Sequence, residues 1–577
     1  MLSKKYFNVL FSALEKRQKI NMIFFALLIL FITFLESFSL GIFYPFLQSI
    51  TNNEINPTIL NIYETIKFKL NIDLNFEFIS ILILAAIIVT KNLLSFFFEY
   101  WQLSFLNQLR INIKTKILKS HFNNEYEISS NIKMSTYVRD FNSTIETFVI
   151  SFYSVIQFFI ELAIFLGVLI LLFIIQSKEV IFFSTLIASI ALIIFFLLKK
   201  LMNRYGQKHL EFQEKSLGKL IDILNSTKEI IVFKKESLFT KQFKSIEFKS
   251  LDIIKKVSLL TKFPKFFFES LVIISFTVFI FFAKSKGIEL SQLLPELSIV
   301  FLALLKLLPG ITKLLFYSQK LGFAEKAATK ISNDIKIYEK TEKQKQLNSE
   351  KISFNQSIEL KNIKFKYKSR DNIIFENLNF KMNKGEYIGI HGPSGGGKST
   401  FIGLLCGFLK PISGEIIIDE NKILNLSQTN WLEKVSYLTQ ENNLIDESIL
   451  RNITFEFDNQ KIDFDLFKIV CEQSGLNNLI QKSPEKFNTE IGQKGISISG
   501  GERQRIGIAR SLYAKKEILI FDESTSNLDD ENKFKFIETI NQLSLNKTII
   551  IISHDQEVIK NCKIKFLITN NNLSILS

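Results

Sequence analysis

The chain reads Gly392-Pro393-Ser394-Gly395-Gly396-Gly397-Lys398-Ser399-Thr400 at the point that decides the fold of its C-terminal part. This stretch matches the pattern G-x-x-x-x-G-K-[ST], in which backbone N–H groups, one ammonium and one hydroxyl surround a polyphosphate. Apolar residues precede it at 388–390, and a helix-forming run follows it at 401–405. A strand would deliver such a loop to the positive N-terminal end of a helix, which is the setting that phosphate binding requires. The sequence therefore predicts a nucleotide-binding α/β domain around this loop.

The 577 residues divide into two parts of different composition. Up to about residue 320 long apolar runs dominate, whereas from about residue 350 apolar residues come in short, strand-length groups. The long runs form six segments, each able to cross about 30 Å of hydrocarbon as a helix: 22–48, 77–101, 145–175, 179–203, 264–284 and 292–317. We expect an all-α six-helix transmembrane domain followed by the α/β P-loop domain. The predicted boundaries are a cytoplasmic segment at 1–20, the transmembrane domain at 21–320, a linker at 321–355 and the nucleotide-binding domain at 356–577.

The distribution of basic residues along the chain agrees with this topology. Lysine and arginine gather before the first span and in the long connections at 104–140 and 204–262, so the positive-inside rule places both chain ends in the cytoplasm. The apolar run after residue 20 is too long for a signal peptide, and we expect it to be retained as the first span. The formal net charge of +15 comes mostly from lysines scattered among Glu and Asn, not from arginine stripes between exposed aromatic residues. This pattern argues against nucleic-acid binding.

Cysteine use indicates a reducing compartment for the soluble part. Cys406, Cys471 and Cys562 form an odd, widely spaced set. Their spacing fits neither a disulfide framework nor a zinc site.

Charged residues inside or beside the predicted spans are the candidates for substrate binding. They are Glu36, Lys91, Glu161, Lys265, Glu269, Lys306 and Lys313. An ionisable group at the bilayer centre costs about 2.5–3.5 kcal/mol on insertion scales, so each should face a cavity or a partner. We expect Lys91, Lys265, Lys306, Lys313 and Glu36 to line a cavity for an anionic ligand. Two structural alternatives stay open: the lysine stems reach the membrane interface, or Glu36 and Glu161 neutralise the lysines.

A possible short helix at 57–68 lies on the outward side, between the first two spans. Its apolar residues recur at helical spacing. Such a helix would lie in the headgroup plane or pack against the span ends.

Two further stretches of the soluble part carry residues suited to phosphate chemistry. The apolar run 518–521 ends in Asp522 and Glu523, an arrangement in which the first acid holds Mg²⁺ and the second polarises a water molecule. Ser499, Gly500, Gly501 and Glu502 open a helix-forming stretch. Small residues at that position present N–H groups at a positive helix end, where a second phosphate contact is favourable.

The order of these elements resembles that of the ATP-binding cassette (ABC) family, and the resemblance covers the soluble part from end to end. It implies ATP and Mg²⁺ as ligands. Tyr367 would stack on adenine, Gln440 would reach Mg²⁺ together with Ser399 and Asp522, and His554 would contact the γ-phosphate beside Lys398. Glu523 would act as general base or position the water. Ile498, Glu502, Asn527 and Gly396 depart from the residues usual in the family, and none of these changes removes a reacting group.

In the ABC family the serine-glycine signature, here Ser499 to Glu502, faces the phosphate loop of a second cassette. One chain would therefore be half of a transporter in the inner membrane of a bacterium. The resemblance implies a homodimer, or a heterodimer with a paralogue, that closes on two MgATP and reopens after hydrolysis. It also implies a segment at 489–492 that contacts membrane-domain connections, a loop at 526–529 that crosses the dimer interface, and coupling helices at 121–129 and 225–233.

The first and last spans resemble those of PglK-type lipid-linked oligosaccharide flippases, through the stretches FLESFSL at 34–40 and ALLKLLP at 303–309. This resemblance implies transport of a polyprenyl-diphosphate-linked oligosaccharide from the cytoplasmic to the outer leaflet. The four lysines would take the basic cavity positions, and residues 57–68 the outward helix. Two alternatives stay open: an exporter of drugs, peptides or another lipid, and a membrane-tethered regulatory ATPase that transports nothing.

Overall fold

The structure is a computed structural model that describes residues 11, 14–50, 76–123, 133–175, 178–285, 290–347, 352–367, 372–393, 395–423, 430–440, 442–492, 498–525, 528–569 and 572–576. The chain forms two compact units. A helical unit lies within residues 1–123 and 132–340, and an α/β unit lies within residues 341–577.

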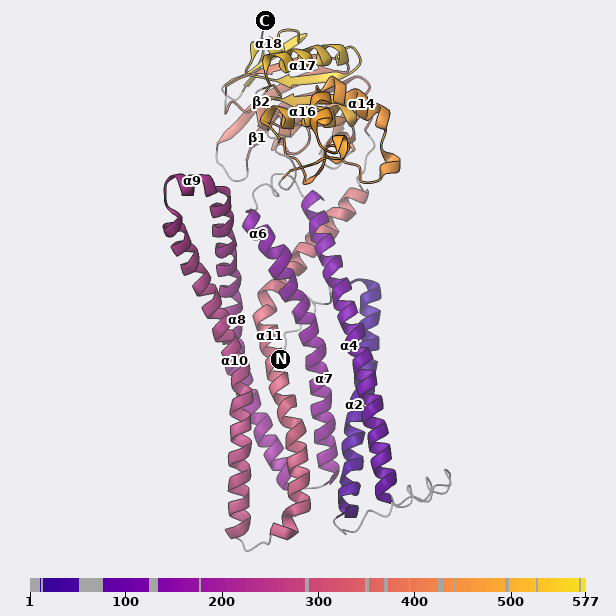
Figure 1. The fold of residues 1–577 in the computed structure, drawn as a ribbon, viewed down its shortest axis with the longest axis vertical. Coiled ribbons are helices and arrows are strands. Elements are labelled where there is room, and N and C mark those ends of the chain that lie inside the picture. The colour runs from indigo at the N-terminus through magenta and orange to yellow at the C-terminus, as the bar shows by residue number, and fades with distance from the viewer. Residues whose placement is uncertain are drawn as a thin grey trace. The chain divides into compact units, whose positions relative to one another are not determined.

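Six helices of more than 30 residues make up most of the helical unit as far as it is described (Figure 1). They are α2 (Lys16–Ile50), α4 (Phe76–Asn123), α7 (Ile145–Ile175), α8 (Lys178–Asn225), α10 (Glu236–Ser285) and α11 (Leu290–Leu347). Each contains one of the six predicted spans. Among the described residues, three stretches are long and apolar enough to cross a membrane: Lys16–Ser39, Phe78–Phe122 and Met134–Val168. These candidate stretches overlap the first three predicted spans. Many side chains of the other three lie outside the described residues.

Several helices extend well beyond their predicted spans. At about 1.5 Å per residue, the 48 residues of α4 reach about 70 Å, more than twice the hydrocarbon thickness. The segment 321–355, predicted as a linker, is helical up to Leu347. Apolar residues at helical spacing bury one face of α11 in this segment. These residues are Ala324, Ala327, Ala328, Ile331 and Ile335.

Aromatic side chains hold the first helices of this unit together. Phe25 of α2 meets Phe98, Trp101 and Phe105 of α4 edge to face, with centroid distances of 5.5, 4.7 and 5.4 Å. The same core includes Phe148 and other residues of α7. Such edge-to-face contacts add stabilisation beyond the burial of apolar area.

Short helical segments interrupt or join the long helices. Helix α6 (Met134–Arg139) and the π-helix η1 (Asp140–Thr144) lead directly into α7. Helices α8 and α10 lie side by side, joined by α9 (Thr227–Val232) at one end (Figure 1). The predicted coupling segment 225–233 thus contains a short helix, whereas most of 121–129 and all of the predicted helix at 57–68 lie outside the described residues.

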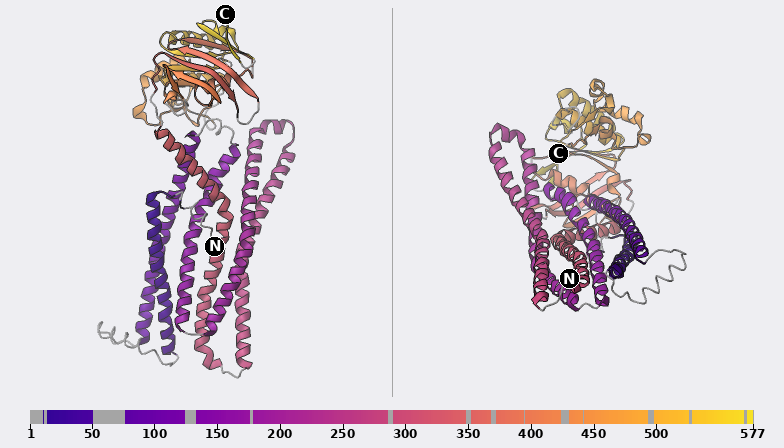
Figure 2. Two further views of the ribbon diagram at one scale, coloured as in Figure 1. Left: turned by 180° about the vertical axis from the view of Figure 1, so that it is seen from behind. Right: turned by 60° about the horizontal axis from the view of Figure 1, so that its bottom comes forward.

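The α/β unit contains two main sheets (Figure 2). The antiparallel sheet has the order β2-β1-β4-β5, formed by β1 (Ser357–Lys366), β2 (Ile373–Asn383), β4 (Ser413–Ile418) and β5 (Asn421–Ile423). The second sheet has the order β12-β11-β3-β10-β9-β6, formed by β3 (Tyr387–His391), β6 (Val435–Leu438), β9 (Ile518–Asp522), β10 (Thr548–Ile552), β11 (Ile564–Thr569) and β12 (Asn572–Ile575). All its pairings are parallel except that of β11 with β12.

Helices accompany the parallel sheet, and the central strands of the sheet are buried. The helices are α12 (Lys398–Leu405), α13 (Ile449–Thr454), α14 (Phe464–Gln473), α15 (Asn477–Lys482), α16 (Gly500–Tyr513), α17 (Asp530–Leu543) and α18 (Gln556–Ile559), and β7 (Glu447–Ser448) pairs with β8 (Glu490–Ile491). Every residue of β9 and β10 is buried, as expected for central parallel strands. The carboxyl ends of β3, β10 and β9 therefore meet at one edge, where α/β folds bind ligands.

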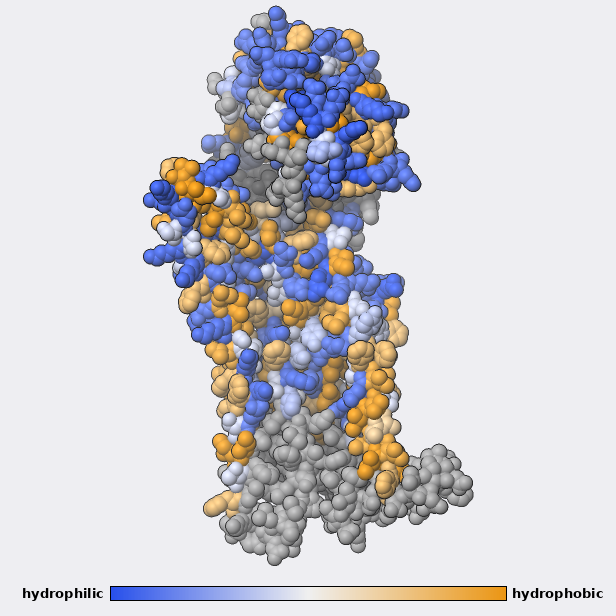
Figure 3. Space-filling model, viewed as in Figure 1, coloured by the Kyte–Doolittle hydropathy of each residue, from blue (hydrophilic) through white to orange (hydrophobic). Residues whose placement is uncertain are grey.

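The surfaces of the two units differ in character. Figure 3 shows hydrophobic residues spread widely over the helical unit, whereas hydrophilic ones cover most of the visible face of the α/β unit. Ile23, Leu27 and Leu30 of α2 are each about 60% exposed or more. Exposed apolar side chains along a long helix are what a lipid environment stabilises.

Candidate nucleotide-binding site

The predicted phosphate loop has the predicted setting. Strand β3 enters the loop and α12 begins at Lys398. Gly395 and Gly397 have φ angles of 81° and 100°, a region that glycine adopts at little cost. A Cβ atom on Gly392 would lie 2.5 Å from the carbonyl oxygen of Ile568, so only glycine fits beside β11. Ser394 lies outside the described residues.

The three predicted catalytic residues form one cluster at the carboxyl ends of β3, β9 and β10. Lys398 Nζ donates to the Gly392 carbonyl at 2.8 Å and lies 2.7 Å from His554 Nε2. The Glu523 carboxylate completes the cluster, with Oε1 2.8 Å from His554 Nε2 and 3.6 Å from Lys398 Nζ. A cation, an imidazole and a carboxylate thus lie together beside the loop.

Glu523 is held in an unusual backbone conformation. Its φ angle is 49°, in the left-handed region that costs a residue with a side chain about 1–2 kcal/mol. Two hydrogen bonds fix this conformation: the Glu523 N–H donates to the Ile552 carbonyl at 2.9 Å, and the Gln504 side chain donates to the Glu523 carbonyl at 3.1 Å. Strain of this kind is frequent at functional sites.

Asp522 and Gln440 flank the cluster. The Asp522 side chain is 6% exposed, and this burial raises the pKa of its carboxyl group. The Tyr437 hydroxyl donates to Asp522 Oδ2 at 3.0 Å, which lowers the same pKa and partly opposes the effect of burial. Gln440 Nε2 donates to Glu523 Oε2 at 2.6 Å. The predicted Mg²⁺ ligand Gln440 therefore lies next to the predicted general base.

The oxygen donors at this edge fit a magnesium ion. Ser399 presents an exposed hydroxyl in the first turn of α12, and Asp522 offers a carboxylate at the end of β9. Magnesium sites in nucleotide-binding proteins use one or two such oxygen ligands together with substrate phosphates. Within the described residues no group of three or more His, Cys, Asp or Glu side chains could hold a metal ion unaided. The phosphates would have to supply the remaining ligands.

Tyr367 lies at the far end of the phosphate loop. Its hydroxyl is 3.0 Å from Thr400 Oγ1, and its ring meets Phe365 edge to face at 5.1 Å. The ring is therefore fixed beside the loop.

The signature residues form the start of α16, as predicted. Ser499 caps the helix by accepting the N–H of Glu502 at 3.2 Å, while Glu502 Oε2 accepts the N–H of Ser499 at 2.9 Å. This reciprocal pair is a capping box. Among the described residues no hydrogen bond joins Ser499 to Lys398 or His554.

Sequence reasoning missed three residues that organise the site. Tyr437 hydrogen-bonds to the Asp522 side chain, and Gln504 hydrogen-bonds to the Glu523 carbonyl, as described above. Arg510 joins α16 to α13, since its guanidinium donates to the Asn452 carbonyl at 2.8 Å and to Asn442 Oδ1 at 3.0 Å. Partial burial lowers the pKa of Arg510 to about 10. The only sequence signal for these residues was their position within or beside the predicted motifs.

The predicted substrate residues of the helical unit lie in ion pairs. Lys91 Nζ is 2.6 Å from Glu36 Oε2, and Lys313 Nζ is 2.7 Å from Glu161 Oε1. Lys265 lies 3.9 Å from Glu269, and both of these side chains are more than half exposed. The side chain of Lys306 lies outside the described residues. The alternative in which Glu36 and Glu161 neutralise the lysines fits this geometry.

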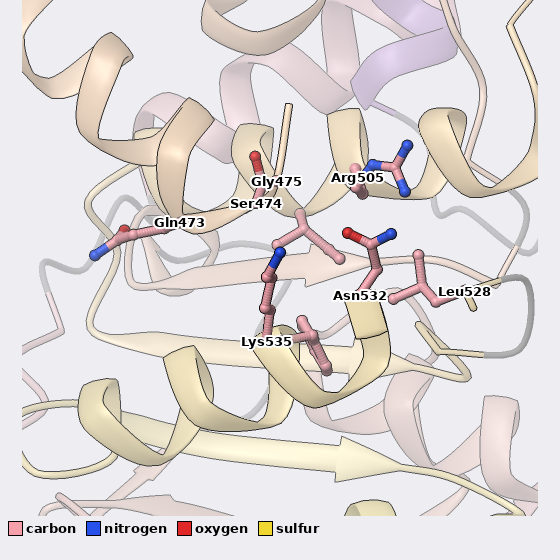
Figure 4. A pocket seen from close by; sticks show the side chains of 9 residues that line it. Gln473, Ser474, Gly475, Arg505, Leu528, Asn532 and Lys535 are labelled. Carbon is pink, nitrogen blue, oxygen red and sulfur yellow. The ribbon is translucent and has the colours of Figure 1, made fainter. Parts of the chain in front are cut away.

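A small pocket lies apart from these residues, between α14, α16 and α17 (Figure 4). Gly475, Arg505, Leu528, Asn532 and Lys535 line it. It contains none of the residues predicted to bind ATP, Mg²⁺ or substrate, but Leu528 belongs to the predicted interface loop 526–529.

Comparisons with known proteins agree with this site. The ABC transporter family model matches residues 375–526. The chain is 38% identical over 218 residues to the alpha-hemolysin translocation ATP-binding protein HlyB of Escherichia coli O157:H7, a match that covers 38% of this chain and 30% of that protein. It is also 38% identical over 205 residues to the leukotoxin export ATP-binding protein LtxB of Aggregatibacter actinomycetemcomitans, covering 35% of this chain and 29% of that protein. The matches thus span about 30% of the length of these curated relatives.

A solved structure shares the whole fold. A bacterial Atm1-family ABC exporter with ATP bound has a TM-score of 0.75 to this protein, over 97% of this chain and 94% of that chain, at 19% sequence identity. The α/β unit thus matches the ABC transporter family model over residues 375–526, and the chain as a whole shares the fold of this ABC exporter.

Proposed function

We propose that the protein is an ATP-driven exporter whose site is completed by a second chain. The observation that carries the proposal is the Lys398–His554–Glu523 cluster, with Gln440 bonded to Glu523, at the carboxyl ends of three adjacent parallel strands. Positioning and charge stabilisation provide most of the rate enhancement in phosphoryl transfer, and this cluster supplies both.

Each residue has a distinct part in this chemistry. The loop N–H groups and Lys398 hold the β- and γ-phosphates, and His554 contacts the γ-phosphate. Glu523 accepts a proton from the attacking water or positions it, while Gln440 holds the Glu523 carboxylate in place. Mg²⁺, bound by Ser399 and Asp522, would neutralise the charge that develops on the phosphates.

The unit of function in this proposal is a homodimer. Ser499 and the N–H groups of Gly500 and Gly501 are placed at a positive helix end and would contact the ATP of the other chain. ATP-dependent dimerisation of the detergent-solubilised protein, measured by light scattering, tests this point. If dimers formed only after a paralogous chain was added, the unit of function would be a heterodimer and not a homodimer.

The transported molecule in this proposal is a polyprenyl-diphosphate-linked oligosaccharide. The resemblance of 34–40 and 303–309 to PglK-type flippases supports it, and so does Lys313, whose side chain is 55% exposed while its partner Glu161 is 8% exposed. An anionic diphosphate could pair with this accessible ammonium. The relatives HlyB and LtxB are named for toxin translocation and export, so a protein or peptide cargo is the competing outcome.

Flipping in liposomes tests the substrate directly. The wild-type protein and Lys398→Ala would be reconstituted with a fluorescent polyprenyl-diphosphate glycan, and its outer-leaflet fraction followed with and without ATP. ATP-dependent flipping by the wild type alone supports the proposal. ATP hydrolysis without transport of any lipid or peptide would instead support a regulatory ATPase, and stimulation only by hydrophobic cations or peptides would support another exporter.

A further inference from the structure

A hydrogen-bonded cluster of polar side chains lies between α4, α7 and α11. Gln157 Nε2 donates to Gln102 Oε1 at 3.1 Å and lies 3.5 Å from Glu99 Oε2. The side chain of Tyr153 lies next to those of Glu99 and Tyr317, and the two tyrosine rings are 6.2 Å apart in an edge arrangement. None of these residues was among the predicted substrate residues. We call them the Glu99 cluster: Glu99, Gln102, Tyr153, Gln157 and Tyr317.

The Glu99 cluster retains unused hydrogen-bonding capacity. Gln102 is fully buried, and its Nε2 has no hydrogen-bond partner in the described structure. Glu99, Tyr153 and Tyr317 are half-buried, so a ligand could reach them. Among the described residues the Glu99 carboxylate accepts a hydrogen bond from Gln157 and lies next to Tyr153, and no Lys or Arg pairs with it. Polar groups at membrane depth are costly without partners, so this cluster points to a ligand.

The Glu99 cluster lies next to the Lys313–Glu161 ion pair, in which Lys313 is accessible. Tyr317 lies four residues after Lys313 on α11, and Gln157 lies four residues before Glu161 on α7, so each step is one helical turn, about 6 Å. In the predicted topology α11 approaches the cytoplasm after Lys313, and α7 leaves it before Glu161. The Glu99 cluster therefore lies about one turn nearer the cytoplasm than the Lys313–Glu161 pair.

This order matches the order of groups in a glycolipid. In the cytoplasmic leaflet the lipid tail lies deepest, the diphosphate lies next, and the first sugars lie nearest the cytoplasm. A diphosphate beside Lys313 would place the first sugar about one turn further, at the Glu99 cluster.

The chemistry of the cluster suits hydroxyl groups. Amide and phenol groups both donate and accept hydrogen bonds, and a carboxylate accepts from two hydroxyls at once. The Glu99 carboxylate would repel an anion, whereas sugar hydroxyls can form hydrogen bonds with all five side chains. A site built for hydroxyls also rejects analogues that lack them, because its own polar groups then stay unpaired. We infer that the Glu99 cluster binds the hydroxyl groups of the first sugars of the transported lipid, an inference that rests on the proposed flippase function.

Binding measurements on the full-length protein in nanodiscs test the inference. The probes are bare undecaprenyl diphosphate, undecaprenyl diphosphate carrying a neutral oligosaccharide, and tetraphenylphosphonium as a hydrophobic cation. We expect the wild type to bind the glycosylated lipid about tenfold more tightly than the bare lipid, the value of one or two net hydrogen bonds. In Tyr153→Phe with Glu99→Leu this ratio should fall towards one. Glu99→Gln, which keeps the hydrogen-bonding groups, should retain most of it.

A matched control separates loss of the site from loss of the fold. Thr90→Val changes an exposed residue of α4 whose hydroxyl bonds only to the Ala86 carbonyl, and it should keep the wild-type ratio. Thermal unfolding midpoints of all variants check folding.

Each of the remaining outcomes overturns either the inference or the flippase proposal. Equal binding of the two lipids by the wild type overturns the inference and leaves the flippase proposal intact. Failure of the wild type to bind either lipid overturns the flippase proposal itself. Tetraphenylphosphonium binding that Glu99→Gln abolishes shows a cation site and overturns the inference.

Discussion

Replacing Glu523 with glutamine separates ATP binding from hydrolysis. In the wild type Glu523 Oε1 lies 2.8 Å from His554 Nε2, and Oε2 accepts from Gln440 at 2.6 Å. A glutamine has the same size but offers only one acceptor and cannot take a proton at neutral pH. Its NH₂ group would face another donor on one side of the site. Loss of a general base lowers kcat by about 10²–10⁴-fold, so we expect a loss in this range.

Binding should survive this substitution, because it removes a negative charge 3.6 Å from Lys398, beside the place where the phosphates would lie. Phosphate release under steady state gives kcat and KM, and light scattering with ATP gives the dimer fraction. We expect kcat to fall, KM to change less than threefold, and the ATP-bound dimer to persist. The matched control Glu531→Gln removes an exposed carboxylate that pairs with Lys535 on α17, and its kcat should equal that of the wild type. A kcat for Glu523→Gln within tenfold of the wild type would refute the assignment of Glu523 as base.

Three further substitutions test the supports of the site. Tyr437→Phe removes the hydrogen bond that lowers the raised pKa of Asp522, so the acidic limb of the ATPase pH profile should move to higher pH; an unmoved limb would show that Asp522 does not control it. Gly397→Ala places a side chain at a φ of 100° and should lower the free energy of unfolding by about 1–2 kcal/mol in urea titrations, whereas Gly385→Ala, at a φ of 81° with open space around it, reports the backbone strain alone. Arg510→Met leaves Asn442 and the Asn452 carbonyl without their donor and should cost about 2–4 kcal/mol in the same titration; a loss below about 0.5 kcal/mol would contradict a structural role for this contact.

Local patterns predicted those parts of the site that depend on neighbours in sequence. The loop between β3 and α12, the strand ending in Asp522 and the helix starting at Gly500 all follow from residues within one or two turns of each other. Their phosphate chemistry follows in turn from backbone N–H groups at helix starts, which need no distant contact.

The supports of the site depend on strand register, which the sequence does not reveal. Parallel pairing of β6 with β9 sets Tyr437 opposite Ile520, and this register allows the Tyr437 hydroxyl to reach Asp522 two residues further on. Nothing in residues 435–440 identifies that partner. The helical extension of α11 to Leu347 was missed for a related reason, since its alanines bury a face only against other helices of the unit.

The Lys91–Glu36 and Lys313–Glu161 ion pairs differ in what a substitution would report. Lys91 and Glu36 are 18% and 9% exposed, so Lys91→Gln leaves a buried carboxylate without its cation, a change that costs about 3–5 kcal/mol in buried pairs. Loss of transport in that variant would report misfolding as readily as lost substrate binding. Lys313 is 55% exposed, so solvent or a ligand already reaches its charge, but its partner Glu161 is 8% exposed and would lose its cation in Lys313→Gln. Transport by the charge-balanced double variant Glu161→Gln with Lys313→Gln, compared with the double variant Glu36→Gln with Lys91→Gln, therefore isolates the contribution of a cation to headgroup binding. If only Glu36→Gln with Lys91→Gln lost transport, the α2–α4 pair and not Lys313 would be the site of recognition.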